Sequence, residues 1–177
     1  KLQERSRILS SAMNKINVLD TILKNIDSST ISKTIMYFSE QNPEQINQAN
    51  ELLSNQDIKY HQITHNESPK ERDKIIEYFK NDYYKVLTAK RILDEGVNIP
   101  SIEVAYIVSS NSQPRQWTQR RGRVLRKCPG KDEAFIHDFI VLPSATAPIK
   151  YQKKLIEKEL ERIDEFAKLS KNQYKED

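Results

Sequence analysis

The chain has 177 residues, of which 37% are hydrophobic and 31% charged, and its formal net charge is +4 at pH 7. This length and composition support one domain, or one domain with an appendage, and the small positive charge mildly favours a polyanionic partner. Three glycines leave little room for a glycine-rich phosphate loop, the single Cys128 excludes a disulfide framework and a cysteine-rich zinc site, and no apolar run is long enough to span a membrane.

The first part of the sequence predicts helices that alternate with strands. Residues 4–26 carry apolar side chains at helical spacing, so we expect an amphipathic helix there. The apolar run at 34–38 indicates a buried parallel strand, and residues 43–54 return to a helix with Pro43 in its first turn. Residues 58–64 predict a second strand.

A further helix is predicted to begin at Ser68. A serine cap, a proline at the first helical position and Glu71 three residues after the cap form the pattern of a capping box. Ile75, Ile76 and Phe79 give this helix an apolar face that we expect to be buried.

The remaining sequence predicts three more strands, at residues 84–88, 102–108 and 134–141. Between the last two we expect a helix that begins near Ser112 and is rich in arginine. A charged amphipathic helix follows at 149–170, and then a fraying tail. Because strands alternate with helices, the fold class is α/β with a parallel sheet, and ligands bind such sheets at the carboxyl ends of the strands.

The arginine-rich segment is one of two loops that we expect to converge at that edge. Gln119, Arg123 and Arg126 are spaced i, i+4 and i+7, which places them on one face of a continuous helix. Guanidinium groups fork onto phosphate oxygens, so this pattern points to a nucleoside triphosphate or to nucleic-acid phosphates, although a solvated basic surface has the same pattern. Gly122 costs a helix about 1 kcal/mol relative to alanine, which favours a close approach of a backbone or a ligand there.

The other loop follows the third strand. Gly96 permits a tight turn in it, and Pro100 stops any helix. Asp94, Glu95 and Asn98 are polar groups on this constrained loop, and an ordinary turn with solvated acids fits them as well.

Taken in order, these segments resemble the motifs of superfamily 2 helicases. The stretch from Asp94 to Pro100 resembles motif V, and the stretch from Gln119 to Arg126 resembles motif VI. The strand that ends before Ser39 resembles motif IV. The residues of these motifs are most similar to those of the DEAD/DEAH branch that contains XPB-like DNA helicases and the helicase subunits of restriction and phage-defence systems. DNA repair or restriction is therefore the expected biological process.

The resemblance implies the second of two RecA-like domains. We expect a three-layer domain with a mostly parallel sheet and an N-terminal helix over residues 1–142, and a helical extension over 143–177. ATP and Mg²⁺ would be bound mainly by the first RecA-like domain of the same protein. The sequence does not begin with methionine and lacks a phosphate-loop spacing, so we expect a fragment that does not hydrolyse ATP alone.

Roles on the nucleotide side carry over from the resemblance. Arg123 and Arg126 fall at the arginine-finger positions, which reach across the cleft between domains to the γ-phosphate and contribute about 10³–10⁵ in rate in related reactions. Gln119 would lie near the γ-phosphate and the attacking water. The expected nucleotide-side positions are Glu95, Gly96, Asn98 and Arg120. At the position of Asn98, many relatives have an aspartate that contacts the ribose. Arg120 would brace the interface with the first domain.

Roles on the nucleic-acid side also carry over. Lys90 stands where many relatives have threonine or serine touching the nucleic-acid backbone, and a lysine contacts a phosphate as a point charge. The complete set expected to face the bound strand is Ser39, Thr64, His65, Lys90 and Arg91. No metal ligands are predicted, and no membrane contact.

The sequence therefore predicts the second motor domain of an ATP-dependent helicase or translocase, with DNA favoured over RNA. A non-catalytic nucleic-acid-binding module and a translocating subunit of a restriction or defence nuclease remain the alternatives. Gln119 beside the finger arginines favours the motor, because a simple phosphate grip does not need it. A single cysteine fits a reducing compartment, so we expect a cytoplasmic protein, or a nuclear one in a eukaryote.

Overall fold

The computed structural model describes residues 12, 14–40, 42–64, 66–90, 99–109, 121–143, 148–168 and 170–171. The chain separates into two compact units, Lys1–Phe139 and Ile140–Asp177. No helix among the described residues is long and apolar enough to cross a membrane.

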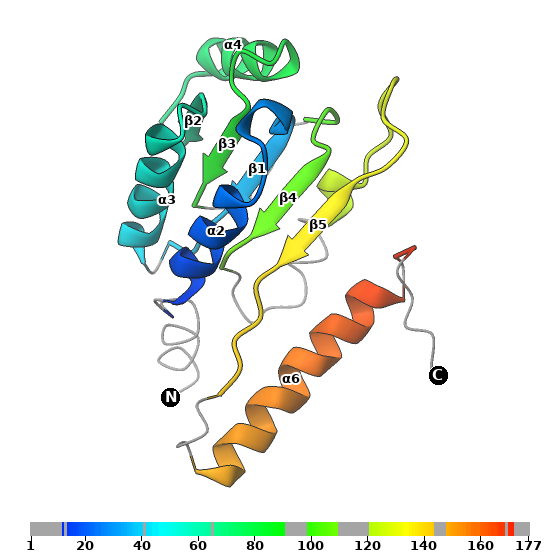
Figure 1. Cartoon of the computed structure of the whole chain (residues 1–177). Coiled ribbons are helices and arrows are strands. Elements are labelled where there is room, and N and C mark those ends of the chain that lie inside the picture. Colours follow the sequence, from blue (N-terminus) through cyan, green and yellow to red (C-terminus); the bar gives the residue numbers. More distant parts are fainter. Residues whose placement is uncertain are drawn as a thin grey trace. The chain divides into compact units, whose positions relative to one another are not determined.

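Five parallel strands form the sheet of the first unit (Figure 1). They are β1 (Thr34–Tyr37), β2 (Tyr60–Ile63), β3 (Val86–Ala89), β4 (Val104–Ile107) and β5 (Phe135–Asp138). Their order across the sheet is β2-β3-β1-β4-β5, and every neighbouring pair is parallel. The predicted α/β class with a parallel sheet is therefore confirmed.

Helices α3 (Pro43–Asn55) and α4 (Pro69–Lys80) connect these strands as the sequence predicted. Before β1 lie α2 (Asn14–Lys24), within the predicted first helix, and the 3-10 helix η1 (Ser28–Thr30), which was not predicted. The capping box of α4 is present, because Ser68 accepts a hydrogen bond from the Glu71 amide and the Glu71 carboxylate accepts one from the Ser68 amide. Ile75, Ile76 and Phe79 are buried as expected.

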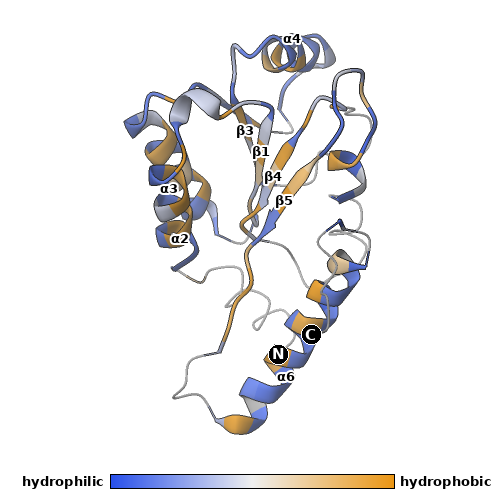
Figure 2. Ribbon diagram, turned by 45° about the vertical axis from the view of Figure 1, so that its right-hand side comes forward, coloured by the Kyte–Doolittle hydropathy of each residue, from blue (hydrophilic) through white to orange (hydrophobic). Residues whose placement is uncertain are grey.

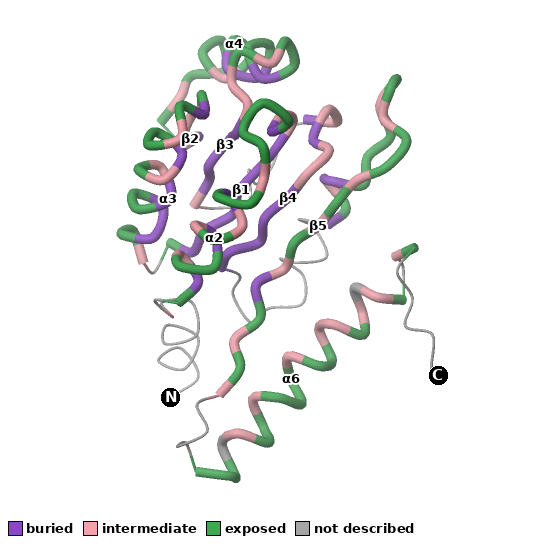
Figure 3. Tube along the Cα trace, viewed as in Figure 1, coloured by how far each residue is buried: buried purple, intermediate pink, exposed green. Residues whose placement is uncertain are grey.

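Buried apolar side chains lie on both faces of the sheet, as expected for a sheet that forms the middle layer of a three-layer domain. A cluster on one face draws on the strands and on α2 and α3, which lie on the same side of the sheet in Figure 2. Its large members include Leu19, Leu23, Met36, Phe38, Ile46, Leu53 and Tyr106. Ile35 and Leu87 alternate to the opposite face and are also fully buried. Figure 3 accordingly shows the central strands β1 and β3 as buried along their length.

Lys33 joins the start of β1 to the end of α4. Its ammonium donates to the carbonyl of Phe79 over 3.1 Å and to the carbonyl of Lys80, and it lies 3.1 Å from Oδ1 of Asp82. The last carbonyls of a helix have no partner within the helix, so a cation there satisfies them and complements the helix dipole. Lys33 therefore acts as a C-terminal cap for α4 that comes from a distant part of the chain.

The second unit contains α6 (Ile149–Ala167), which confirms the predicted terminal helix up to Ala167. Several of its apolar side chains are exposed, among them Ile149 at 82% and Leu160 at 55%. Its charged residues pair along the helix, as Lys168 does with Asp164 at 2.6 Å.

Candidate nucleotide and nucleic-acid site

The register of the strands places four polar residues at one edge of the sheet. Tyr37 lies opposite both Ala89 and Ile107. Residues that follow these strand ends therefore meet at the carboxyl edge. Across the sheet from β2 to β4 they are Thr64, Lys90, Ser39 and Ser109. The first three are residues that the sequence predicted for nucleic-acid contact.

Two of these residues are buried at the edge. Ser39 is 3% exposed and Ser109 is fully buried. The hydroxyl of Ser109 donates to Oε1 of Gln45 over 2.8 Å, and Nε2 of Gln45 donates to the carbonyl of Ala12 over 3.3 Å. This network fixes the first turn of α3 against the end of β4. Ser109 was not singled out by the sequence, because its role depends on this partner on α3.

Lys90 and Thr64 differ in their surroundings. Lys90 is half-buried, and no described residue forms a hydrogen bond or an ion pair with its side chain. The hydroxyl of Thr64 donates to Oε1 of Glu67 over 2.8 Å, and the Thr64 amide donates to the same carboxylate. A phosphate contact through the Thr64 hydroxyl proton therefore requires Glu67 to release it, whereas Lys90 meets no such competition from the described residues.

The structure describes the arginine-rich segment from Arg121 onward. Residues 121–124 are helical, and the amide of Leu125 donates to the carbonyl of Arg121 over 3.0 Å. Arg126 lies beyond the helix, in a turn where its amide meets the carbonyl of Arg123 at 3.5 Å. The prediction that Arg126 lies on one continuous helical face with Gln119 and Arg123 is therefore wrong, because the helix ends first.

The described helical turn, residues 121–124, has a buried side and an exposed side. Val124 is fully buried and Arg121 is 9% exposed, whereas Arg123 is half-buried and Arg126 is exposed. Among the described residues, no atom lies within 4 Å of a Cβ added to Gly122. The close approach predicted there from the sequence stays a prediction.

Lys131 binds the end of this segment. Its ammonium donates to the carbonyl of Val124, to that of Arg126 over 3.1 Å and to that of Pro100 over 3.4 Å. Burial lowers the pKa of Lys131, against the opposing influence of Glu103 and the Cys128 side chain. The sequence did not point to Lys131, because its partners lie on other segments of the chain.

These contacts place the end of the arginine segment beside the start of two strands. Pro100 precedes β4 and Lys131 precedes β5, and the amide of Phe135 donates to the carbonyl of Glu103 over 2.7 Å. Figures 1 and 2 show the helical turn of residues 121–124 near the end at which β5 begins. The expectation that both loops converge at the carboxyl edge falls largely on residues 91–98 and 110–120, which lie outside the described part of the chain, so it stays a prediction. The Arg126 carbonyl itself is bound by Lys131, which also binds the Pro100 carbonyl ahead of β4.

The other predicted site residues lie outside the described part of the chain. They are His65, Arg91, Glu95, Gly96, Asn98, Gln119 and Arg120. Their roles stay predictions. Among the described residues, no group of three histidine, cysteine, aspartate or glutamate side chains is placed to hold a metal ion.

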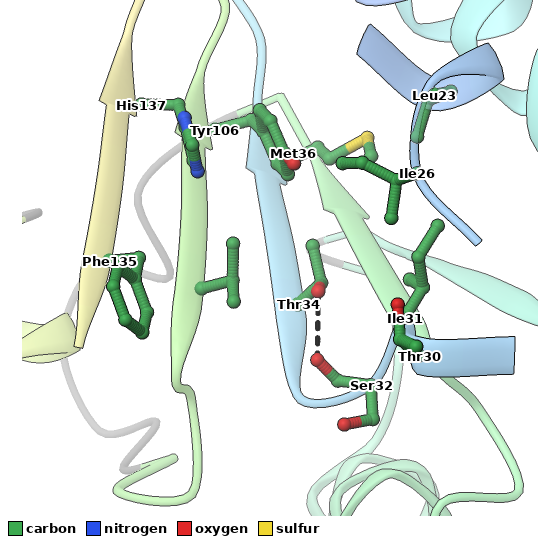
Figure 4. Close-up of a pocket in the computed structure, with 11 residues that line it drawn as sticks. Leu23, Ile26, Thr30, Ile31, Ser32, Thr34, Met36, Tyr106, Phe135 and His137 are labelled. Carbon is green, nitrogen blue, oxygen red and sulfur yellow. Dashed lines mark hydrogen bonds between the residues drawn. The ribbon is translucent and has the colours of Figure 1, made fainter. Parts of the chain in front are cut away.

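A hollow of about 200 Å³ on the α2 side of the sheet is a separate feature (Figure 4). The first residues of β1, β4 and β5 line it, and the rings of Tyr106 and His137 stack beside them with centroids 4.6 Å apart. Burial lowers the pKa of His137 and raises that of Tyr106. The lining is largely apolar and lies toward the amino ends of the strands, so this hollow is not part of the carboxyl-edge site.

Residues 14–128 match the family model of the helicase conserved C-terminal domain. This match covers more than half of the chain, so the chain belongs to that family. The five-stranded parallel sheet and the order of the motifs agree with this assignment.

Among curated proteins, the chain is similar to DNA 3'-5' translocase XPB2 of Sulfurisphaera tokodaii, with 35% identity over 65 residues that make up 37% of this chain and 15% of that protein. It is also similar to "Putative ATP-dependent helicase IRC3" of Saccharomyces cerevisiae, with 28% identity over 136 residues, or 75% of this chain and 19% of that protein. The chain thus spans less than a fifth of the length of these two relatives.

Solved structures share the fold at low sequence identity. T4 UvsW matches with a TM-score of 0.66 and 17% identity over 95% of this chain and 35% of that one. The C-terminal domain of the DEAD-box protein Dbp5 matches with a TM-score of 0.60 and 17% identity over 86% of this chain and 79% of that one. These likenesses support the RecA-like fold of helicase C-terminal domains.

Proposed function

We propose that this chain is the second motor domain of an ATP-dependent helicase or translocase that acts on DNA. The observation that carries the proposal is the place of Arg123 and Arg126 at the carboxyl end of the helix that ends at Val124, in a member of the helicase C-terminal family. Arg126 is exposed, and no described atom lies within 4 Å of a Cβ added to Gly122 on the same turn. DNA as the track is supported by the similarity to a protein named as a DNA translocase.

The two arginines supply charge rather than covalent chemistry. Their planar guanidinium groups offer forked donors to the γ-phosphate of ATP as negative charge spreads onto it during phosphoryl transfer. By the family resemblance, Mg²⁺ would be held by the first motor domain. The arginines are useful only when the domains close, and this couples hydrolysis to motion between them.

The nucleic acid would be gripped at a different place. Lys90 and Ser39 lie at the carboxyl edge, while the Arg126 carbonyl is bound by Lys131, which also binds the Pro100 carbonyl ahead of β4. Loss of the γ-phosphate removes the ligand of the arginines, the domains part, and the edge carrying Lys90 advances along one strand. Contacts to phosphates carry little sequence information, so we expect little sequence preference from this domain.

The test is the ATPase activity of the full-length protein and of its Arg126→Ala variant, with single-stranded DNA, double-stranded DNA and RNA. We expect stimulation by DNA and a loss of about 10³-fold or more in stimulated kcat in the variant, with DNA binding largely retained. Lys127→Ala removes a neighbouring exposed charge and is the matched control. Unchanged hydrolysis in R126A would contradict the finger assignment.

The alternatives make different predictions in the same experiment. A non-catalytic binding module would bind DNA without any polymer-stimulated ATPase activity in the full-length protein. A translocating subunit of a nuclease would show stimulated ATPase activity without separating the strands of a duplex. RNA as the better stimulant would overturn the choice of DNA and keep the motor.

A further inference from the structure

Lys131 is fixed in place by the turn that precedes it. The amide of Lys131 donates to the carbonyl of Cys128 over 3.1 Å, which closes a four-residue turn. Pro129 occupies its second position and Gly130 its third, where φ is +80°. These are the residues and the backbone angle of a type II turn, and a side chain other than glycine is strained at the third position. The turn sends Lys131 back toward the arginine segment.

The ammonium of Lys131 then joins three carbonyls from two segments. Two of them, from Val124 and Arg126, belong to the end of the arginine segment, and the third, from Pro100, belongs to the loop that follows β3. An ammonium has three donors, so these contacts use its full capacity. Carbonyls at the end of a helix lack partners within the helix, and here Lys131 supplies them.

We propose that Lys131 is a positioning residue for the arginine fingers, which it holds by binding the main chain on either side of Leu125 and by joining that segment to the Pro100 loop. This inference rests on the proposed function. Arg126 lies outside the helix, and its amide meets the carbonyl of Arg123 only at 3.5 Å. The contact of Lys131 with the Arg126 carbonyl, at 3.1 Å, adds a second and shorter bond to this main chain.

The role predicts a specific kinetic effect. An arginine finger displaced by about 1 Å no longer binds the transferring phosphate well in the transition state, and such misplacement costs about 10²-fold in rate. The arginine side chain and its charge are still present, and the ATP-binding loop of the first domain is untouched. We therefore expect Lys131→Met in the full-length protein to lower DNA-stimulated kcat by about 10²-fold while KM for ATP changes little.

Three further variants separate positioning from general stability. Lys127→Met removes the same charge from an exposed neighbour and should leave kcat unchanged. Lys131→Arg keeps a cation with several donors and should recover part of the activity. The double variant K131M/R126A should be no slower than R126A alone, because a misplaced finger and an absent finger fail at the same step.

Several outcomes would overturn the proposal. Wild-type kcat in K131M, an equal loss in K127M, or losses in K131M and R126A that multiply in the double variant would each do so. If K131M does not fold, Lys131→Gln is measured instead. Its amide is one bond shorter and has two donors for three carbonyls, so we expect a partial loss of kcat, and wild-type kcat in K131Q would overturn the proposal. An R126A variant with normal kcat would remove the finger proposal and this one together, whereas a slow R126A beside a normal K131M would remove this one only.

Discussion

The hydroxyl of Ser109, just after β4, donates to Oε1 of Gln45 on α3 over 2.8 Å, and both side chains are at most 1% exposed. The two residues are 64 positions apart in the sequence. This bond joins α3 to the carboxyl edge of the sheet, where Ser39 and Lys90 also lie. The geometry of the edge therefore depends on a buried polar pair.

Removing that hydroxyl should destabilise the protein. Ser109→Ala leaves Oε1 of Gln45 buried without this donor, so we expect a loss of about 1–3 kcal/mol in the free energy of unfolding. Urea unfolding followed by circular dichroism measures it. Ser54→Ala on the exposed side of α3 is the control and should change stability by less than about 0.5 kcal/mol. Equal stability of the two variants would show that the buried bond contributes nothing.

The Lys33 cap should also be measurable. Its side chain is only 14% exposed, and Lys33→Met would leave the carbonyls of Phe79 and Lys80 without their donor. We expect a loss of about 1–3 kcal/mol in thermal or urea unfolding. Lys80→Met removes a charge from the same turn but keeps the cap, so it should have a small effect. A larger effect for Lys80 than for Lys33 would contradict the capping role.

The capping box at the start of α4 should make stability depend on pH. Ser68→Ala removes the side-chain cap and should cost about 1 kcal/mol, while Ser68→Thr keeps it. Hydrogen bonds from the Ser68 side chain and main chain lower the pKa of Glu71. A carboxyl group with a lowered pKa stabilises the fold above its unfolded pKa, and this contribution is lost as the pH falls through the folded value. The difference between wild type and Ser68→Ala should therefore shrink in acid, and unfolding at pH 7 and pH 3 tests it.

Lys90 should account for one phosphate contact. In the full-length protein, Lys90→Ala should weaken DNA binding about equally for different sequences and reduce the slope of log affinity against log salt concentration by about 1. Fluorescence anisotropy over a range of salt concentrations measures this slope. Lys80→Ala carries the same charge change at the end of α4 and should leave the slope unchanged. A slope that falls equally in both variants would indicate an unspecific charge effect.

The order of the elements could be predicted because each is encoded locally. The continuous apolar run before Ser39 became the buried strand β1, and the serine, proline and glutamate at Ser68 to Glu71 became the capped start of α4. Alternation of strands and helices was enough to predict a parallel sheet. The motifs from Asp94 to Pro100 and from Gln119 to Arg126 were enough to predict the family, which the match over residues 14–128 confirms.

The tertiary structure decided what lies between those elements. Helical spacing predicted one face for Arg123 and Arg126, but the helix ends before Arg126, and its closing carbonyls bind Lys131. The partners of Lys33, Ser109 and Lys131 lie on other elements, and sequence periodicity reports only which side of an element is apolar. Long-range polar contacts depend on how the elements pack, so the sequence by itself determined the fold and the family, and the packing decided how the arginines are held.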